Sequence, residues 1–497
     1  MNLTQEFPFY MMLPMHLRVK ILLNCDVKTM LNLASTCTEL YQLLITANIL
    51  LNRVKLSIKF SSNVSDNVDL LTTLLQNSLA GRRYSKLKLA IIHEAKGNLQ
   101  PLMLKIFPLI GGSVKDLEIT SSRVNGSFLV NVMKCFENVE KLSLNNLRMD
   151  EANAENRKTL LALKDLTLHD SSSSLLNLFE AHQDLTRLKL HLHARESYEM
   201  LYKVYNLENF LINQTHLNTL ELSRLHKNCL FKTDRINEID FQLESLTANK
   251  IFLHSKYAAK FFKAQKSLKS IKLSDFYDAR IFADSDDYIE VLRTIFTLPQ
   301  LQSIRIFNQT IELGDFQFLA DISNDSVAEL EYDMWSITIF EKLIKMFRKL
   351  KKISFRCFTV KLRDVPSAML AIMCTSGAYN LEEFSYQPSH VKTSQEVFEK
   401  NLLDFIRRNL TIQHLTLGAS TWIEDGFGMS LSCLIEILYL LPNIGEFIVY
   451  NPHDVRLLVM LLLRSRNSLS SVTIFTDETG KSSTQGLTEK KWLKIVC

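Results

Sequence analysis

The sequence predicts an α/β protein in which a small N-terminal helical bundle precedes a right-handed solenoid of parallel strands and helices. Three observations predict this architecture. A short strand-like apolar pattern recurs more than a dozen times, helical segments lie between its copies, and a dense apolar segment with helical spacing precedes them. At 497 residues the chain exceeds what one compact core usually needs, which favours an extended repeat or several domains.

The N-terminal segment opens with apolar residues at helical spacing. Pro14 suits the start of a helix, where its missing N–H costs no hydrogen bond. Leu13, Leu17, Ile21 and Leu22 then fall on one stripe of that helix. This stripe is wide enough to serve both an internal core and a partner.

A second helical stretch follows after a short break. Asp26 or Thr29 can cap it, and Leu31, Ala34 and Cys37 are in helical register within it. Together the two stretches predict a helical bundle of roughly forty residues, which has too little core to be stable alone.

One pattern, apolar–x–x–apolar–x–apolar, organises the rest of the chain. The alternation at its last two apolar positions predicts a short strand with one buried face. Its copies start roughly 22–33 residues apart. Clear copies begin at residues 114, 139, 163, 185, 217, 243, 268, 301, 327, 350, 381, 412, 444 and 469, and weaker copies begin at residues 51 and 84.

Segments with helical spacing lie between the copies, for example at 288–300, 340–350 and 397–410. A strand followed by a helix and a parallel strand forms a right-handed crossover. Repeated many times, this unit predicts a solenoid with strands on the concave side and helices on the convex side. The alternative, ordinary α/β units in two or three globular domains, would produce the pattern only once or twice by chance.

The array resembles the leucine-rich-repeat family over roughly residues 51–475. The Asn or Cys that the family places after the strand is mostly missing, and Asn146, Asp170 and Asn308 fall one place before it. The variable spacing is similar to that of the irregular repeats in eukaryotic intracellular proteins.

The N-terminal segment, roughly residues 8–54, resembles the F-box motif. The resemblance rests on Leu13-Pro14, Leu17, the Ile21-Leu22 pair, Asp26, and the apolar residues from Met30 to Cys37. An F-box directly before leucine-rich repeats is a recurrent eukaryotic architecture. The expected domains are an F-box-like helical domain at 8–54, a solenoid of roughly 14–16 irregular repeats at 55–475, and a C-terminal tail or cap at 476–497.

The resemblance implies a substrate-recognition subunit of a Skp–cullin–F-box ubiquitin ligase that performs no bond chemistry itself. A Skp-type adaptor, and through it a cullin–RING ligase, would bind Leu13, Pro14, Leu17, Ile21, Leu22 and Leu31. The concave face would bind the substrate protein. Two alternatives stay open: a ligase-independent scaffold whose N-terminal helices only cap the solenoid, and a receptor gated by a small molecule.

Strand geometry predicts the concave face, because residues two, four and six places after each repeat start point the same way. These positions combine stripes of opposite charge with aromatic residues near the C-terminal end, which fits a mixed-charge site for a protein segment. The same charges could instead only pair across neighbouring strands on a solvated surface. The candidate substrate-binding residues are Arg305, Phe307, Glu329, Glu331, Asp333, Lys352, Arg356, Tyr450 and Phe475.

Composition argues against several other functions. The net charge of +5 is weak for a nucleic-acid-binding protein, and the 13 glycines leave few phosphate-binding loops. The sequence contains no GxSxG, HExxH or P-loop motif that would indicate an enzyme. The HLH sequence at 191–193 is not expected to bind a metal. Neither a cofactor nor a metal is therefore expected.

The expected location is cytoplasmic and/or nuclear, with no membrane or nucleic-acid partner. No segment reaches the roughly 18–20 apolar residues of a membrane-spanning helix, and the N-terminus lacks the basic region of a secretory signal. The eight cysteines form no CxxC pair and have irregular gaps, which fits reduced thiols.

Overall fold

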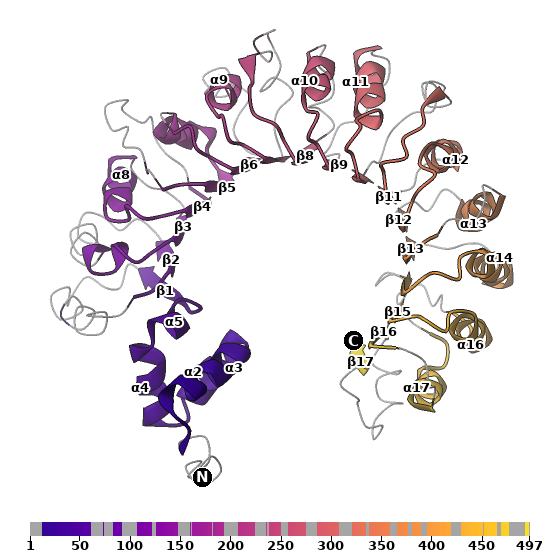
Figure 1. The fold of residues 1–497 in the computed structure, drawn as a ribbon, viewed down its shortest axis with the longest axis horizontal. Helices are drawn as coiled ribbons and strands as arrows, with labels where there is room; N and C mark the ends of the chain where they lie inside the picture. The colour runs from indigo at the N-terminus through magenta and orange to yellow at the C-terminus, as the bar shows by residue number, and fades with distance from the viewer. Residues whose placement is uncertain are drawn as a thin grey trace. The chain divides into compact units, whose positions relative to one another are not determined.

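The chain divides into two compact units, each described separately below (Figure 1). Unit 1 comprises residues 1–230 and 235–241, and unit 2 comprises residues 231–234 and 242–497. The computed structural model describes residues 12–60, 73, 83–91, 107–121, 126–147, 160, 162–180, 182–192, 207–223, 235, 238–249, 257–274, 286–307, 321–333, 337–357, 365–375, 380–388, 395–418, 429–450, 452–464, 469–476 and 493–496.

The described residues of unit 1 form seven strands that pair in parallel and in chain order. They are β1 (Lys55–Phe60), β2 (Lys86–Ile91), β3 (Asp116–Ser121), β4 (Lys141–Asn145), β5 (Asp165–Ser171), β6 (Arg187–Leu192) and β7 (Thr219–Ser223). The helices are α2 (Met15–Asn24), α3 (Val27–Ala34), α4 (Thr38–Thr46), α5 (Asn48–Leu51), α8 (Gly126–Lys134), the 3-10 helix η4 (Ser173–Phe179) and α9 (Leu207–Ile212).

In the part of unit 2 that the structure describes, ten strands show the same parallel pairing in chain order. They are β8 (Ser245–Asn249), β9 (Ser270–Ser274), β10 (Ser303–Phe307), β11 (Glu329–Asp333), β12 (Lys352–Cys357), β13 (Glu383–Pro388), β14 (His414–Leu417), β15 (Glu446–Tyr450), β16 (Ser471–Phe475) and β17 (Leu493–Val496). The helices are α10 (Ala258–Ala264), α11 (Asp286–Phe296), α12 (Ile337–Met346), α13 (Val365–Thr375), α14 (Gln395–Arg408), α16 (Leu431–Leu440) and α17 (Val455–Arg464).

Each strand buries alternate residues, as the repeat pattern predicts. In β3, Leu117 and Ile119 are 1% exposed, whereas Asp116, Glu118 and Thr120 lie on the open face. In each unit the strands line the inner side of a curve and the helices between them lie on its outer side, whereas α2–α5 lie before the first strand (Figure 1). This confirms the predicted fold class: an α/β leucine-rich-repeat solenoid with N-terminal helices.

The helices pack on the buried face of the sheet through one apolar stripe. In α14, Phe398, Leu402 and Phe405 are fully buried at three- and four-residue spacing. The ring of Phe405 lies 4.5 Å from that of Phe384 in β13. Helix α14 therefore covers β13, and the ring of Phe384 lies 6.0 Å from that of Phe355 in β12, so these neighbouring repeats share one core.

The predicted second helix of the N-terminal segment is interrupted, so the expected helical register of Cys37 with Leu31 is wrong. The hydroxyl groups of Ser35 and Thr36 bond back to the carbonyls of Asn32 and Leu33, at 2.6 and 2.7 Å. Such bonds compete with the helical ladder, and α3 ends at Ala34. Cys37 has extended dihedral angles and is the N-cap of α4, with its sulfur accepting the Leu40 N–H.

The caps predicted before these helices are confirmed. Asp26 is the N-cap of α3, and its carboxylate accepts the backbone N–H and the hydroxyl of Thr29 at 2.8 and 2.9 Å. Pro14 immediately precedes α2, and its carbonyl accepts the N–H of Leu17 at 2.9 Å.

A serine occupies the position where leucine-rich repeats usually carry Asn in the repeat that starts at 163. The fully buried Ser171 hydroxyl accepts the Leu147 N–H at 3.1 Å and lies 2.9 Å from the Leu144 carbonyl. Asn146 and Asp170, one place earlier, have φ of 55° and 47°, a conformation that Asn and Asp tolerate better than most residues. The hydrogen bonds of Ser171 and the turns at Asn146 and Asp170 therefore stabilise the C-terminal ends of β4 and β5.

Candidate protein-interaction surfaces

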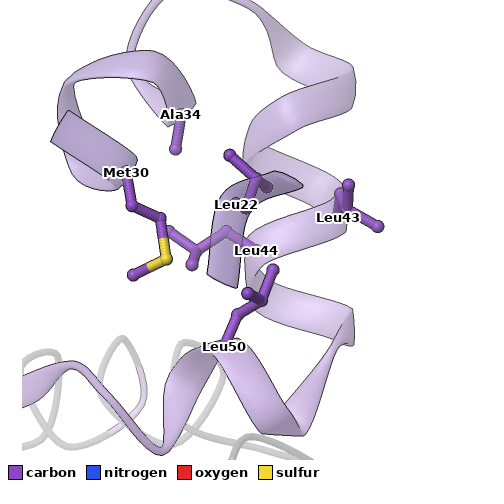
Figure 2. Packing of buried hydrophobic residues seen from close by; sticks show 6 residues of the cluster. All are labelled: Leu22, Met30, Ala34, Leu43, Leu44 and Leu50. Atoms are coloured by element: carbon purple, nitrogen blue, oxygen red, sulfur yellow. The ribbon is translucent and has the colours of Figure 1, made fainter. Parts of the chain in front are cut away.

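The helical domain, α2–α5, has a core of its own (Figure 2). Burial of each large apolar side chain contributes about 1.5–3 kcal/mol, so this core fixes the four short helices relative to one another. Figure 2 shows the buried side chains Leu22, Met30, Ala34, Leu43, Leu44 and Leu50.

Arg53 caps the C-terminal end of α2 through its side chain. Its guanidinium nitrogens lie 2.6 Å from the Leu23 carbonyl oxygen and 2.8 Å from that of Cys25. The last carbonyls of a helix lack intrahelical partners, and a cation there also interacts favourably with the helix dipole. Because Arg53 lies between α5 and β1, it ties the first helix to the segment that leads into the sheet.

Apolar side chains on α2 and α3 remain exposed although this core is complete. Leu17 and Ile21, one helical turn apart on α2, are 37% and 41% exposed, and Leu31 on α3 is 41% exposed. Pro14, also exposed, lies on the same stripe as Leu17 and Ile21. We call Pro14, Leu17 and Ile21 the α2 apolar row. A row of exposed apolar side chains of this kind is typical of a docking surface.

The six predicted adaptor-binding residues occupy two environments. Leu22 is 2% exposed and belongs to the helical core, so it supports α2 from inside and contributes only indirectly to a docking surface. The other five reach the surface: Leu13 is half-buried, and Pro14, Leu17, Ile21 and Leu31 are exposed. The structure adds Met15, 54% exposed at the start of α2, which the helical stripe had not singled out.

The concave face of unit 2 carries a hollow of about 120 Å³ over β10–β13, which we call the charged hollow. Arg305 Nε lies 3.4 Å from Glu331 Oε2. Lys352 Nζ lies 3.4 Å from Glu329 Oε1 and 3.4 Å from Glu383 Oε2. Strand register explains these pairs, because Lys352 lies opposite Glu329 on one side and Glu383 on the other. The structure therefore brings four of the candidate substrate-binding residues together.

The predicted cross-strand pairing of charges is thus present in the charged hollow. The carboxylates of Glu329 and, to a lesser extent, Glu383 raise the pKa of Lys352, which keeps its charge. The partners remain substantially exposed, and exposed ion pairs add little to stability. These charges can accordingly exchange their present partners for those of a bound protein. Glu383, the second residue after a repeat start, follows the same strand rule but was not among the candidates.

Tyr450 and Phe475 form a separate aromatic pair on the same face of unit 2. Their side chains come from the neighbouring strands β15 and β16, with ring centroids 4.3 Å apart and planes within 5° of parallel. Burial raises the pKa of Tyr450, so its phenol is neutral at physiological pH. Strand β14 lies between this pair and the charged hollow, so the structure does not bring the two groups together.

For three further candidates in these strands, the structure describes only the backbone. Phe307 ends β10, and Asp333 of β11 pairs in register with Arg356 of β12. Their side chains lie outside the described residues.

The concave face of unit 1 carries a second charged surface. The Glu118 carboxylate accepts a hydrogen bond from Lys88 Nζ at 2.6 Å and another from Lys55 Nζ. Although burial acts in the opposite direction, hydrogen bonds from these two lysines lower the pKa of Glu118. Glu118 is four places after the repeat start at residue 114, so the strand rule predicts it on this face, but it was not among the candidate residues.

Glu221 of β7 is held in the same way by Lys189 at 2.8 Å and His191 at 3.1 Å, both from β6. The hydrogen bond from His191, aided by Lys189 and opposed by burial, lowers the pKa of Glu221 from 4.5 to about 2. His191 also contacts the Ser223 hydroxyl, and its ring lies 5.3 Å from that of His169. Sequence reasoning missed Glu221, although it occupies an open-face position of the repeat that starts at 217.

Glu221 makes unit 1 sensitive to acid. Folding lowers its pKa, so its stabilising contribution is complete above about pH 4.5 and is lost as the pH falls toward about 2. Glu221→Gln is expected to lower stability at neutral pH and to reduce the loss of stability between about pH 5 and about pH 3. Thermal denaturation at these pH values measures both effects.

The matched control for this prediction is Glu396→Gln. Glu396 is an exposed carboxylate of α14 and forms no ion pair with any other described residue. The control should follow the wild-type pH dependence. Equal pH dependence of Glu221→Gln and wild type would contradict the assignment.

Among the described residues, no group of three or more His, Cys, Asp or Glu side chains is arranged to hold a metal ion. His193, the second histidine of the HLH sequence, lies outside them. None of the described helices combines the length and apolarity needed to cross a bilayer.

Comparisons with known proteins concern the fold alone. No protein-family model and no curated protein matches the sequence. The chain is similar to a chain of the mouse RP105/MD-1 complex, with a TM-score of 0.35 and 13% identity over 88% of this chain and 63% of that chain. It is also similar to a chain of the yeast Rad7 and Elc1 complex, with a TM-score of 0.31 and 10% identity over 88% of each chain. This chain therefore spans less than two thirds of the mouse chain.

Proposed function

We propose that this chain is the substrate-recognition subunit of a Skp–cullin–F-box ubiquitin ligase. The helical domain binds a Skp-type adaptor, and the concave surface of the solenoid binds a substrate protein. The observation that carries the proposal is the α2 apolar row, which stays exposed on a domain whose core is complete. Its residues Pro14, Leu17 and Ile21 are among the six to which the F-box resemblance assigns adaptor contact.

Catalysis under this proposal is by proximity. Through the adaptor and a cullin–RING ligase, a charged ubiquitin-conjugating enzyme is held near the bound substrate, which raises its effective concentration. The chain supplies two binding surfaces and no reacting side chain. It needs no cofactor, acts in the cytoplasm and/or nucleus, and has neither a membrane nor a nucleic acid as partner.

The open faces of the strands support the substrate-binding part of the proposal. The charged hollow offers both charge signs in exposed pairs, and Tyr450 with Phe475 offers apolar surface. Mixed polar rims and aromatic anchors are typical of protein interfaces.

One observation favours a second candidate function, a ligase-independent scaffold. Residues Leu50 and Leu51 of α5 are buried just before β1, and Arg53 ties α2 to the same segment. These contacts would equally suit helices that only cover the first strand of the sheet. In that case the α2 apolar row would have no adaptor to bind.

Recovery of the adaptor in a pulldown distinguishes the two functions. Leu17→Asp with Ile21→Asp places two charges on the α2 apolar row, and burying them against an adaptor without partners is costly. We expect recovery of a Skp-type adaptor and its cullin in a pulldown to fall by at least about ten-fold relative to wild type. Circular dichroism of the purified variant checks that the solenoid remains folded.

The matched control is Ile435→Asp with Tyr439→Asp. These residues are also one turn apart and exposed, but they lie on α16 in unit 2. The control should recover the adaptor as wild type does. If wild type itself recovers no adaptor, or if both double variants lose it equally, the ligase proposal is wrong and the scaffold remains.

A further inference from the structure

The concave face of unit 1 has an imbalance of charge. The open-face positions of β1–β7 carry seven basic residues and four carboxylates. The basic residues are Lys55, Lys59, Lys86, Lys88, Lys141, Arg187 and Lys189, and the carboxylates are Asp116, Glu118, Asp165 and Glu221.

Most of these carboxylates already have cationic partners. Glu118 is held by two lysines, and Glu221 by Lys189 and His191. Asp165 lies 3.5 Å from Arg187. Although burial opposes them, these cations lower the pKa values of Glu118 and Glu221, whereas burial raises the pKa of Asp165 against the effect of Arg187 and Lys141. Four carboxylates therefore leave an excess of basic residues on this face.

Three exposed lysines of this face form no ion pair with any described residue: Lys59 of β1, Lys86 of β2 and Lys141 of β4. In the strand register Asp116 lies between Lys86 and Lys141, and Asp165 lies between Lys141 and Arg187, yet neither aspartate forms an ion pair with Lys86 or Lys141. We call these three residues the free lysines. They give the face a positive field that a negatively charged partner would neutralise.

We propose that the concave face of unit 1 binds an acidic segment of a partner protein through the free lysines. This deepens the proposed function, because the segment would belong to the captured substrate; the binding itself needs no adaptor. Two features favour a polypeptide over a nucleic acid. None of the open-face positions of β1–β7 is Phe, Tyr or Trp, and the rings of His169 and His191 pack on each other with centroids 5.3 Å apart, so the face lacks the stacking surface typical of single-stranded nucleic-acid binding. Carboxylates also alternate with the cations, which repels a continuous phosphate backbone but not a peptide.

Strand spacing sets the size of the acidic segment. Three inter-strand steps separate β1 from β4, and the register aligns Lys59 with Asn145, four residues along the strand from Lys141. Lys59 and Lys141 are therefore roughly 14 Å apart across the sheet and roughly 13 Å apart along it, or about 19 Å in all. An extended peptide covers this distance in about six residues, so the segment should carry several Asp or Glu residues within a stretch of about seven.

The test measures binding of a fluorescein-labelled oligoglutamate of about ten residues to the full chain by fluorescence anisotropy. Lys59→Glu with Lys86→Glu and Lys141→Glu is expected to weaken binding by at least about ten-fold. Raising the salt concentration from about 50 mM to about 500 mM should weaken binding to wild type as well. A neutral Gly-Ser peptide of equal length should not bind.

The matched control reverses Lys260, Lys263 and Lys266 to Glu, three exposed lysines in or just after α10 that form no ion pair with any described residue. It changes the net charge of the chain equally, so equal weakening by both triple variants would overturn the proposal. Tighter binding of an oligothymidine of the same charge would overturn the choice of a protein partner. Loss of adaptor recovery in the pulldown leaves this measurement unaffected, which separates failure of the proposed function from failure of this site.

Discussion

Replacing Gly111 with alanine is expected to destabilise unit 1 by about 3 kcal/mol. A Cβ atom on Gly111 would lie 1.7 Å from the backbone carbonyl oxygen of Cys135 and 2.8 Å from the carbonyl carbon. Cys135 directly follows α8, so the clash is between the backbones of successive repeats and no side-chain rotation relieves it. The two repeats would have to separate, and the buried rings of Phe107 and Phe136, 5.4 Å apart, would lose packing.

The neighbouring Gly112 supplies the control. A Cβ atom there meets nothing within 4 Å, and Gly112 has no positive φ. Gly112→Ala should therefore change stability by no more than about 0.5 kcal/mol. Thermal denaturation, with hydrogen exchange of residues 107–121 and 126–147, distinguishes the two variants. Equal melting and equal exchange would show that repeat spacing here does not depend on Gly111.

The positions of the strands could largely be predicted from the sequence, because a half-buried strand repeats its apolar residues with a fixed alternation. The first and last strands are exceptions. Strand β17 (Leu493–Val496) continues the sheet within the segment 476–497 that was expected to be a tail or cap, and no copy of the pattern marks it. The weaker copy at residue 51 is two residues out of register, since Leu56, rather than Val54, pairs with Leu87. Leu51 is instead buried in α5. A helix that runs directly into a strand places apolar residues where the pattern mimics a repeat.

Details governed by side-chain hydrogen bonds could not be predicted in this way. Ser171 takes the place of the family's Asn, and nothing in the apolar pattern distinguishes it from a solvent-exposed serine. Gly111 likewise resembles any loop glycine until the Cys135 carbonyl is placed against it. Such contacts join residues about 24 positions apart, from successive repeats.

The candidate sites were predictable to different degrees. The strand rule placed Arg305, Glu331 and Lys352 on one face because side-chain direction alternates along a strand, and adjacency then followed from register. The helical stripe was less informative at α2. It identified Ile21 and Leu22 together, but only the packed structure shows that one is exposed and the other buried.

Leu22→Ala and Leu17→Ala should therefore act on the helical domain in different ways. Leu22 is 2% exposed within the core shown in Figure 2, and its truncation is expected to destabilise the domain by about 2–5 kcal/mol. Leu17 is 37% exposed, and its truncation should change stability by no more than about 0.5 kcal/mol. Hydrogen exchange of residues 15–51 should accelerate in the first variant alone.

Adaptor binding distinguishes the two variants further. Under the proposed function both variants bind the adaptor less well, but for different reasons. Leu17→Ala removes contact area and should raise the dissociation constant by about ten-fold without a change in exchange. Leu22→Ala should lower the fraction of folded domain, so its binding defect should lessen on cooling toward the temperature of maximum stability. A Leu22→Ala variant with normal exchange and no adaptor binding would instead make Leu22 a contact residue. A Leu17→Ala variant with accelerated exchange would make the α2 apolar row part of the fold, which is the arrangement that the scaffold function requires.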